Sequence, residues 1–199
     1  MKPVVLIVAL RFTVATLLVT GVAYPLATTA LAQLLFPWRA NGSIVSDDKG
    51  QALGSELIGQ RFDKSFYFWS RPSAAGDQGY DATASTGSNF GVTSKKLNDR
   101  VAAEVERLRR ENPDASGSVP DDLVTASASG LDPHISLAAA RWQVARVAKA
   151  RGVAPARVQA LVDNSVEGRE LGFLGEARVN VFLLNLALDR QFGRSGATR

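Results

Sequence analysis

The residue types that could carry chemistry are few in this chain. It has no cysteine and a single histidine, His134. Thiolate nucleophiles, disulfides and metal sites built on two imidazoles are therefore excluded. Ser127, Ser129 and Gly130 precede His134, but a nucleophile elbow requires Gly-x-Ser-x-Gly, and the spacing here differs. We predict no catalytic residue, no metal site and no tightly bound cofactor.

A glycine-rich stretch at residues 87–95 comes nearest to a nucleotide-binding motif. A P-loop places lysine directly after its last glycine, whereas Val92 follows Gly91 here. We reject the P-loop. The weaker expectation is a helix that starts near Thr93 or Ser94, whose N-terminus could receive an anion.

Residues 147–162 resemble a DNA-binding helix-turn-helix, with Gly152 at the turn and Val158, Leu161 and Val162 available to pack the second helix. Two observations disfavour DNA. Only Arg157 on that helix could contact phosphate, and DNA affinity requires several such contacts. The predicted membrane topology also places this helix outside the cell. The same pattern fits any two packed helices joined by a glycine turn. A membrane-anchored or secreted nucleic-acid-binding protein is kept as the alternative function.

These residues must be positioned by helices and loops that the sequence also predicts. Helices are expected at 95–110, at 133–151 and over a final segment that carries Val181, Leu184 and Leu188. Asp132 and Pro133 would be the N-cap and first residue of the second helix, with His134 in its first turn. Turn-rich residues 74–94 are predicted to be a long structured loop, and a strand is expected around Ile44.

An aromatic block at residues 60–72 contains five aromatic and three basic residues. Interleaved bases and aromatics can stack nucleotides, and the same residue types form protein interfaces. The third interpretation is a buried aromatic strand whose charged residues face solvent.

The N-terminal segment differs from the rest of the chain. Phe12–Leu35 carries no charge and would rise about 36 Å as a helix, enough to span a bilayer. Lys2 and Arg11 precede it and Arg39 follows it, so the positive-inside rule places the N-terminus in the cytoplasm. A cleaved signal peptide ending at Ala32 is the rival interpretation, but the apolar stretch is longer than usual and continues to Phe36.

One face of this segment carries small residues at alternating spacings of three and four: Thr13, Thr16, Thr20, Ala23, Ala27 and Ala30. Such a face lets another membrane helix approach closely, so we predict a partner inside the membrane. Gly21 and Pro25 are expected to loosen the helix locally.

The predicted fold is a single N-terminal transmembrane helix followed by one α+β (mixed α/β) extracytoplasmic domain. Its parts are a cytoplasmic N-terminus at 1–11, the span at 12–35, the domain at 36–192 and a disordered tail at 193–199. Residues 37–199 carry 21 basic and 19 acidic residues, so no polyanion-binding surplus is present and we predict no nucleic acid partner.

Many short motifs occur in one order along the chain: Gly21-Val22-Ala23-Tyr24-Pro25, Asn41-Gly42-Ser43, Gly54-Ser55-Glu56-Leu57-Ile58-Gly59-Gln60, Tyr67-Phe68, Arg71-Pro72-Ser73-Ala74, Gly87-Ser88-Asn89, Leu123-Val124-Thr125, Ser129-Gly130-Leu131-Asp132-Pro133-His134-Ile135-Ser136, Gly168-Arg169 and Asn185-Leu186-Ala187-Leu188-Asp189. With them the chain resembles, almost end to end, the C subunit of the Kdp potassium-transporting P-type ATPase. It departs at Phe90, Val92 and Ala128, where the family tends to have Leu, Pro and Gly.

The resemblance implies a non-catalytic, single-span subunit of a bacterial inner-membrane complex that couples ATP hydrolysis to electrogenic potassium uptake. It implies as partners a channel-like A subunit, an ATP-hydrolysing B subunit and a small F subunit, so that ATP and potassium are handled by the complex. The family is also described as a catalytic chaperone that raises the ATP affinity of the ATPase subunit. An extracytoplasmic domain could do this only by allosteric coupling.

We expect the following residues to contact partners: Thr13, Thr16, Thr20, Ala23, Tyr24, Pro25, Ala27, Gln60, Phe62, Tyr67, Phe68, Arg71, Pro72, Ser88, Asn89, Ser129, Gly130, Asp132, Pro133 and His134.

Overall fold

The computed structural model describes residues 3–194. The chain divides into two compact units, Met1–Ser55 and Glu56–Arg199. We describe each unit by itself.

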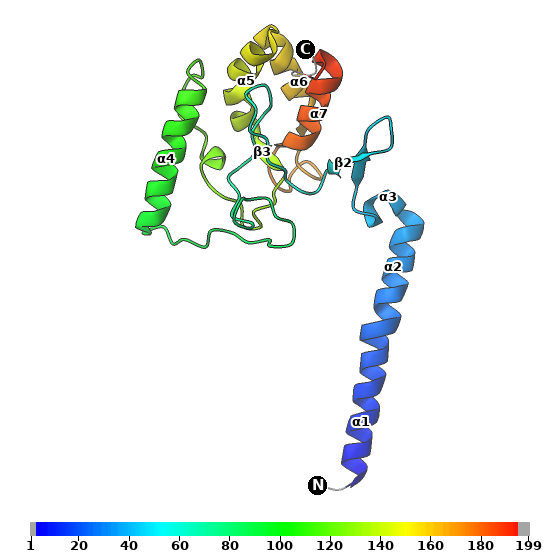
Figure 1. Cartoon of the computed structure of the whole chain (residues 1–199). Coiled ribbons are helices and arrows are strands. Elements are labelled where there is room, and N and C mark those ends of the chain that lie inside the picture. The colour runs from blue at the N-terminus through cyan, green and yellow to red at the C-terminus, as the bar shows by residue number, and fades with distance from the viewer. Residues whose placement is uncertain (1–2, 195–199) are drawn as a thin grey trace. The chain divides into compact units, whose positions relative to one another are not determined.

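The first unit is dominated by one helical segment, Pro3–Leu35, which is long and apolar enough to cross a membrane. It consists of α1 (Pro3–Leu18), a π turn η1 (Val19–Ala23) and α2 (Tyr24–Leu35), and none of its residues is buried. Figure 1 shows it as one continuous rod in blue. The helix is thus present as predicted, but it begins at Pro3 rather than at Phe12.

The π turn has a cause in the sequence. Pro25 has no N–H to donate to the carbonyl of Gly21, and its ring would collide with that carbonyl in a regular α-helix. The backbone instead widens, and the N–H of Tyr24 reaches the carbonyl of Val19. The expected loosening at Gly21 and Pro25 is confirmed.

A short hairpin completes the first unit. After α3 (Pro37–Ala40), strand β1 (Ile44–Ser46) pairs antiparallel with β2 (Ala52–Ser55). The carboxylate of Asp47 accepts hydrogen bonds from the N–H groups of Lys49 and Gln51, both at 2.9 Å, and so closes the turn. The strand expected around Ile44 is confirmed.

Within the described residues, the second unit begins with a long irregular segment, residues 56–94, and continues with four helices and a small sheet. Its elements are α4 (Lys95–Glu111), the 3₁₀ turn η2 (Asp121–Leu123), β3 (His134–Ser136), α5 (Leu137–Arg151), α6 (Pro155–Asn164), β4 (Val166–Glu167), β5 (Arg178–Asn180) and α7 (Val181–Phe192). The sheet order is β3-β5-β4, antiparallel throughout, with Ile135 opposite Val179. Figure 1 shows α5, α6 and α7 gathered beside β3.

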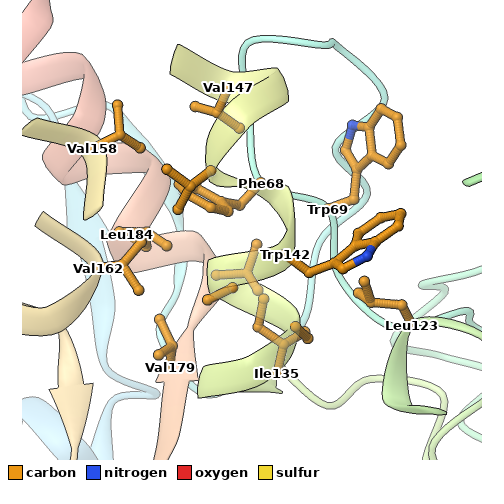
Figure 2. Close-up of a cluster of buried hydrophobic side chains, with 14 of the residues drawn as sticks. Phe68, Trp69, Leu123, Ile135, Trp142, Val147, Val158, Val162, Val179 and Leu184 are labelled. Carbon is orange, nitrogen blue, oxygen red and sulfur yellow. The ribbon is translucent and has the colours of Figure 1, made fainter. Parts of the chain in front are cut away.

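The core of this unit lies around α5. Figure 2 shows Val147 of α5 on the side of Val158 and Val162 of α6 and Leu184 of α7. Trp142 projects from the other side of α5 and lies beside Trp69 and Leu123. Phe68 is fully buried among them. The helices predicted at 95–110 and over Val181, Leu184 and Leu188 are confirmed, and so is the long loop at 74–94.

The predicted start of the α5 helix is wrong. His134–Ser136 is a strand, and the helix begins at Leu137. The carbonyl of Pro133 accepts the N–H of Val181 at 2.9 Å, and Ile135 is buried against Val179, so pairing with β5 outweighs the local cap signal. Ser136 is the N-cap, and its Oγ accepts the N–H of Ala139 at 3.0 Å. Gly152 ends the helix at φ 65°, as predicted.

The aromatic block is not a strand. Phe68 and Trp69 are buried, but their backbone groups pair with side-chain amides instead of a neighbouring strand. Asn185 accepts the N–H of Phe68 and donates to its carbonyl, both at 2.9 Å, and Gln143 does the same for Trp69 at 2.8 and 3.2 Å. Of the predicted disordered tail, only Gly193 and Arg194 are described; residues 195–199 lie outside the described part.

Candidate functional site

Residues 127–134 form the centre of the candidate site, because three separate loops close on their backbone. The N–H of Gly59 donates to the carbonyl of Leu131 at 2.7 Å. A Cβ on Gly59 would lie 2.7 Å from the carbonyl oxygen of Asp132, and one on Gly87 would lie 2.9 Å from that of Ala128. Approaches this close are possible only without a side chain.

Gly130 is the most constrained of these glycines. Its φ of 68° is in the left-handed region, and a Cβ there would lie 2.6 Å from the carbonyl oxygen of Thr86 and 2.8 Å from the nitrogen of Ala75. The Oγ of Ser73 donates to the carbonyl of Gly130 at 2.5 Å, and the Oγ of Ser85 donates to that of Ser129 at 3.0 Å. Two loops are therefore fastened to residues 129–130.

Tyr80 folds back on the Arg71–Ser73 segment, which reaches this centre through Ser73. Its N–H donates to the Oγ of Ser73 at 2.8 Å, and its hydroxyl donates to the carbonyl of Arg71. Burial raises the pKa of Tyr80 to about 12, so the hydroxyl keeps its proton at physiological pH.

A series of charged contacts connects residues 127–134 to the sheet. The carboxylate of Asp132 accepts from Arg71 at 3.1 Å and from the N–H of His134 at 3.0 Å. The His134 ring lies 3.3 Å from Asp132 through Nδ1 and 3.5 Å from Glu167 through Nε2. Burial raises the pKa of Asp132, but the hydrogen bonds from His134 and the charge of Arg71 outweigh burial and hold that pKa below its ordinary value. Asp132 is therefore ionised at neutral pH.

A cavity of about 490 Å³ opens beside this centre. Its lining includes Phe62, Trp69, Arg71, Pro72 and Tyr80 and has charges of both signs. The basic groups have acidic partners at short range: Arg61 lies 3.0 Å from Asp63, and Arg107 lies 3.1 Å from Glu111. Such a balanced lining suits a protein or zwitterionic partner better than a polyphosphate.

Behind the cavity, Arg146 fixes the aromatic block from the core. It donates to the carbonyl of Ser65 and, at 2.9 Å, to that of Tyr67, and its guanidinium lies 3.6 Å from the centroid of the Trp69 ring. Burial lowers the pKa of Arg146 to about 9, which leaves the group charged at neutral pH.

Tyr67 is held from the other side by α7. Its hydroxyl donates to Asp189 at 2.6 Å, and Asp189 also pairs with the buried Arg151 at 2.7 Å. Burial and the carboxylate of Asp189 raise the pKa of Tyr67 to about 12.

Comparison with known proteins identifies this arrangement. The family model of the K⁺-transporting ATPase c chain, KdpC, matches residues 6–190. The chain belongs to the KdpC family. The potassium-transporting ATPase KdpC subunit of Myxococcus xanthus is 66% identical over 185 residues, which cover 93% of this chain and 87% of that protein. Those of Rhodospirillum rubrum and Methylococcus capsulatus are 56% and 55% identical, over 92% and 86% of this chain and 94% and 90% of theirs.

Family membership decides between the two functions considered from sequence. A KdpC chain is a subunit of a potassium-transporting ATPase and not a catalytic enzyme itself. The nucleic-acid alternative has no support. Its helix pair exists as α5 and α6, but Arg157, the expected phosphate contact, lies with its guanidinium 4.9 Å from the centroid of the Phe192 ring.

Most of the predicted contact residues of the second unit gather around residues 127–134. Arg71, Asp132 and His134 are joined by charged contacts, and Ser129, Gly130 and Pro133 lie within residues 127–134. Gln60 follows Gly59, and Phe62 and Pro72 line the adjoining cavity. Phe68 is different, because it is a core residue with no exposed surface. Ser88 and Asn89 lie on the loop before α4, where Ser88 Oγ accepts from Arg100 at 3.4 Å.

The seven predicted membrane contacts lie in the first unit. Thr13 and Thr16 precede the π turn, Thr20 and Ala23 lie within it, and Tyr24, Pro25 and Ala27 follow it. The wider turn rotates the residues beyond it relative to an unbroken α-helix, so Ala27 and Ala30 do not continue the face of Thr13 and Thr16 in one straight line as predicted. Contact between these residues and a partner stays a prediction.

Sequence reasoning missed Tyr80, Gln143 and Arg146. Tyr80 gives no local signal, because its role depends on a loop that folds back on Arg71. Gln143 and Arg146 did give one: they are polar, three residues apart, and lie on the apolar face of α5 between Trp142 and Val147, where a buried polar residue requires a partner.

Proposed function

We propose that this chain anchors and modulates a potassium-uptake ATPase from outside the cytoplasm. In this account residues 12–35, the uncharged part of the Pro3–Leu35 helix, cross the inner membrane once, with the N-terminus in the cytoplasm and residues 56–199 on the outer side. Two charges support the orientation: Lys2 and Arg11 lie on the N-terminal side and only Arg39 follows closely.

The observation that carries the proposal is the exposure of the whole apolar helix. Leu10, Phe12 and Leu34 are 65–78% exposed, and no residue of the helix is buried. A single span has no other helix of its own chain to pack against, so lipid and partner helices must cover it. The small residues around the π turn offer the closest approach, and we assign this face to the channel-like A subunit, with the ATP-hydrolysing B and small F subunits as further members of the complex.

We further propose that the chain raises the ATP affinity of the ATPase subunit by coupling through the membrane. A domain on the outer side cannot touch cytoplasmic ATP. Its effect must therefore be a difference in how well it binds two conformations of its partners.

The proposal is tested in the assembled complex with the triple variant Thr16→Leu, Thr20→Leu and Ala23→Leu. We expect the chain to be lost during purification in detergent, and the KM for ATP of the remaining complex to rise. The control, Val14→Leu with Val22→Leu, also places leucine on the helix but outside this face, and it should leave co-purification unchanged. Full co-purification of the triple variant would contradict the assigned face.

A further inference from the structure

Three apolar side chains project from the loop that joins β4 to β5. Leu171 is 83% exposed, Phe173 is 68% exposed and Leu174 is 48% exposed, all within residues 168–177. Scattered apolar residues are normal on a protein surface, but a contiguous group on one loop tip indicates a contact site. We call residues 169–175 the apolar tip.

The apolar tip is a preformed structure. Glu170 and Leu174 exchange backbone hydrogen bonds of 3.0 and 2.9 Å, and the N–H groups of Gly172 and Phe173 donate to the carbonyls of Arg169 and Glu170. These four N–H groups are paired within the loop, so covering the tip leaves them satisfied. A preformed loop also loses little conformational entropy on binding.

Leu171 adds an energetic argument. Its φ is 52°, a left-handed conformation that is unfavourable for an L-residue. Glycine would adopt this conformation without that cost. Since the side chain is 83% exposed, the fold of this unit gains almost nothing from the leucine. This side chain is therefore available for a contact outside the unit.

The charges around the tip distinguish between possible occupants. Residues 168–178 contain Arg169, Glu170, Glu176 and Arg178, which balance. Arg178 lies 3.1 Å from Glu167 and 3.7 Å from Glu170. Anionic lipid would require a cationic surplus, which this loop does not have. An apolar centre within a neutral, polar rim is the composition of a protein interface.

We propose that the apolar tip inserts into an apolar cleft on the outer face of another subunit of the same complex. The inference rests on the proposed function, which places this unit outside the cytoplasm. The base of the tip also reaches the candidate site, because Glu167 lies 3.5 Å from His134, which in turn lies 3.3 Å from Asp132. A contact at the tip is thus linked to the loops around Gly130.

The absence of native cysteine allows a direct test. Phe173→Cys is compared with Val92→Cys, which is equally apolar and 88% exposed before substitution. Each full-length chain is treated with a maleimide, alone in detergent and within the purified complex. We expect both cysteines to react equally fast in the free chain, and Phe173→Cys to react about tenfold more slowly in the complex because only the undocked fraction is accessible.

Several results would overturn the inference. One is equal labelling of both positions in the complex. Protection of Phe173→Cys in the chain alone in liposomes would identify lipid as the occupant, and protection that grows with the concentration of the chain alone would identify a second copy. If Phe173→Cys folds normally but blocks assembly while Val92→Cys assembles, the inference is supported, and Leu171→Cys serves for labelling. Failure of the wild-type chain to join the complex would refute the proposed function instead.

Discussion

Replacement of Gly130 by alanine tests the packing of the candidate site most sharply. Two costs add at this position. Alanine at a φ of 68° costs about 1–2 kcal/mol, and a Cβ 2.6 Å from the Thr86 carbonyl forces backbone to move, at about 1–3 kcal/mol. We expect the free energy of unfolding to fall by about 2–5 kcal/mol, a large share of the stability of an ordinary domain.

Two other glycines separate these costs. Gly117 has a φ of 82°, and nothing lies within 4 Å of the position that a Cβ would take, so Gly117→Ala should cost only the conformational part, about 1–2 kcal/mol. Gly87 has no left-handed φ, but its Cβ would lie 2.9 Å from Ala128, so Gly87→Ala should cost only the steric part.

The assay is urea unfolding of the full-length chain in detergent, followed by tryptophan fluorescence. Trp69 and Trp142 are buried in the second unit and report on its unfolding, and a Trp38→Phe background removes the signal of the first unit. The midpoint gives the change in free energy when the slope m is unchanged. If Gly130→Ala costs no more than Gly117→Ala, within about 0.5 kcal/mol, the close approach to Thr86 and Ala75 does not exist and the reasoning fails.

Three further changes test the polar supports of the site. Gln143→Leu leaves the N–H of buried Trp69 without its acceptor and should lower the free energy of unfolding by about 1–3 kcal/mol. Asp189→Asn removes the charge beside buried Arg151 and should cost about 3–5 kcal/mol, whereas Asp163→Asn at the exposed Arg141 pair should cost less than about 1 kcal/mol. Folding lowers the pKa of Asp132, so ionised Asp132 stabilises the fold at pH values above its ordinary pKa of 3.8. This stabilisation is lost as the pH falls through the lower pKa of the folded state. Asp132→Asn should therefore lose less stability than the wild type over this pH range.

Urea midpoints measure the first two changes, and midpoints taken between pH 6 and pH 2 measure the third. Equal effects of Asp189→Asn and Asp163→Asn would contradict the buried pair. If the stability of Asp132→Asn falls with pH as steeply as that of the wild type, the lowered pKa is contradicted. If Gln143→Leu leaves the free energy of unfolding unchanged, the N–H of Trp69 has another partner.

The parts of the fold that sequence predicted are those with local causes. Leu97, Val101, Val105 and Leu108 repeat at helical spacing, and α4 follows them. Pro25 removes a donor that an α-helix needs, and a π turn appears there. In both places the physical reason lies within a few residues.

The wrong predictions concern segments whose structure is determined by residues far away in the sequence. Asp132 and Pro133 match a helix start, yet His134–Ser136 pairs with β5, more than forty residues later, and Ser136 becomes the cap. The aromatic block matches a strand, but Asn185 and Gln143 replace the neighbouring strand with their side-chain amides. No local pattern contains these partners, since a buried backbone group requires only that some partner is present.

The same reasoning applies to the site. Sequence could nominate Arg71, Asp132 and His134 as residues with a role, but their meeting depends on the loops that close at Gly59 and Gly130. The apolar tip was not predicted either, because exposure of Leu171 and Phe173 is a property of the folded unit.

The side of the membrane on which residues 56–199 lie is the central claim, because it decides whether the chain acts on ATP binding directly or through the membrane. The most direct measurement is a pair of fusions after Arg199, one to alkaline phosphatase, which is active only outside the cytoplasm, and one to a reporter active only inside. The account predicts an active phosphatase and a silent cytoplasmic reporter. An inactive phosphatase with an active cytoplasmic reporter would contradict it and restore direct contact with cytoplasmic nucleotide.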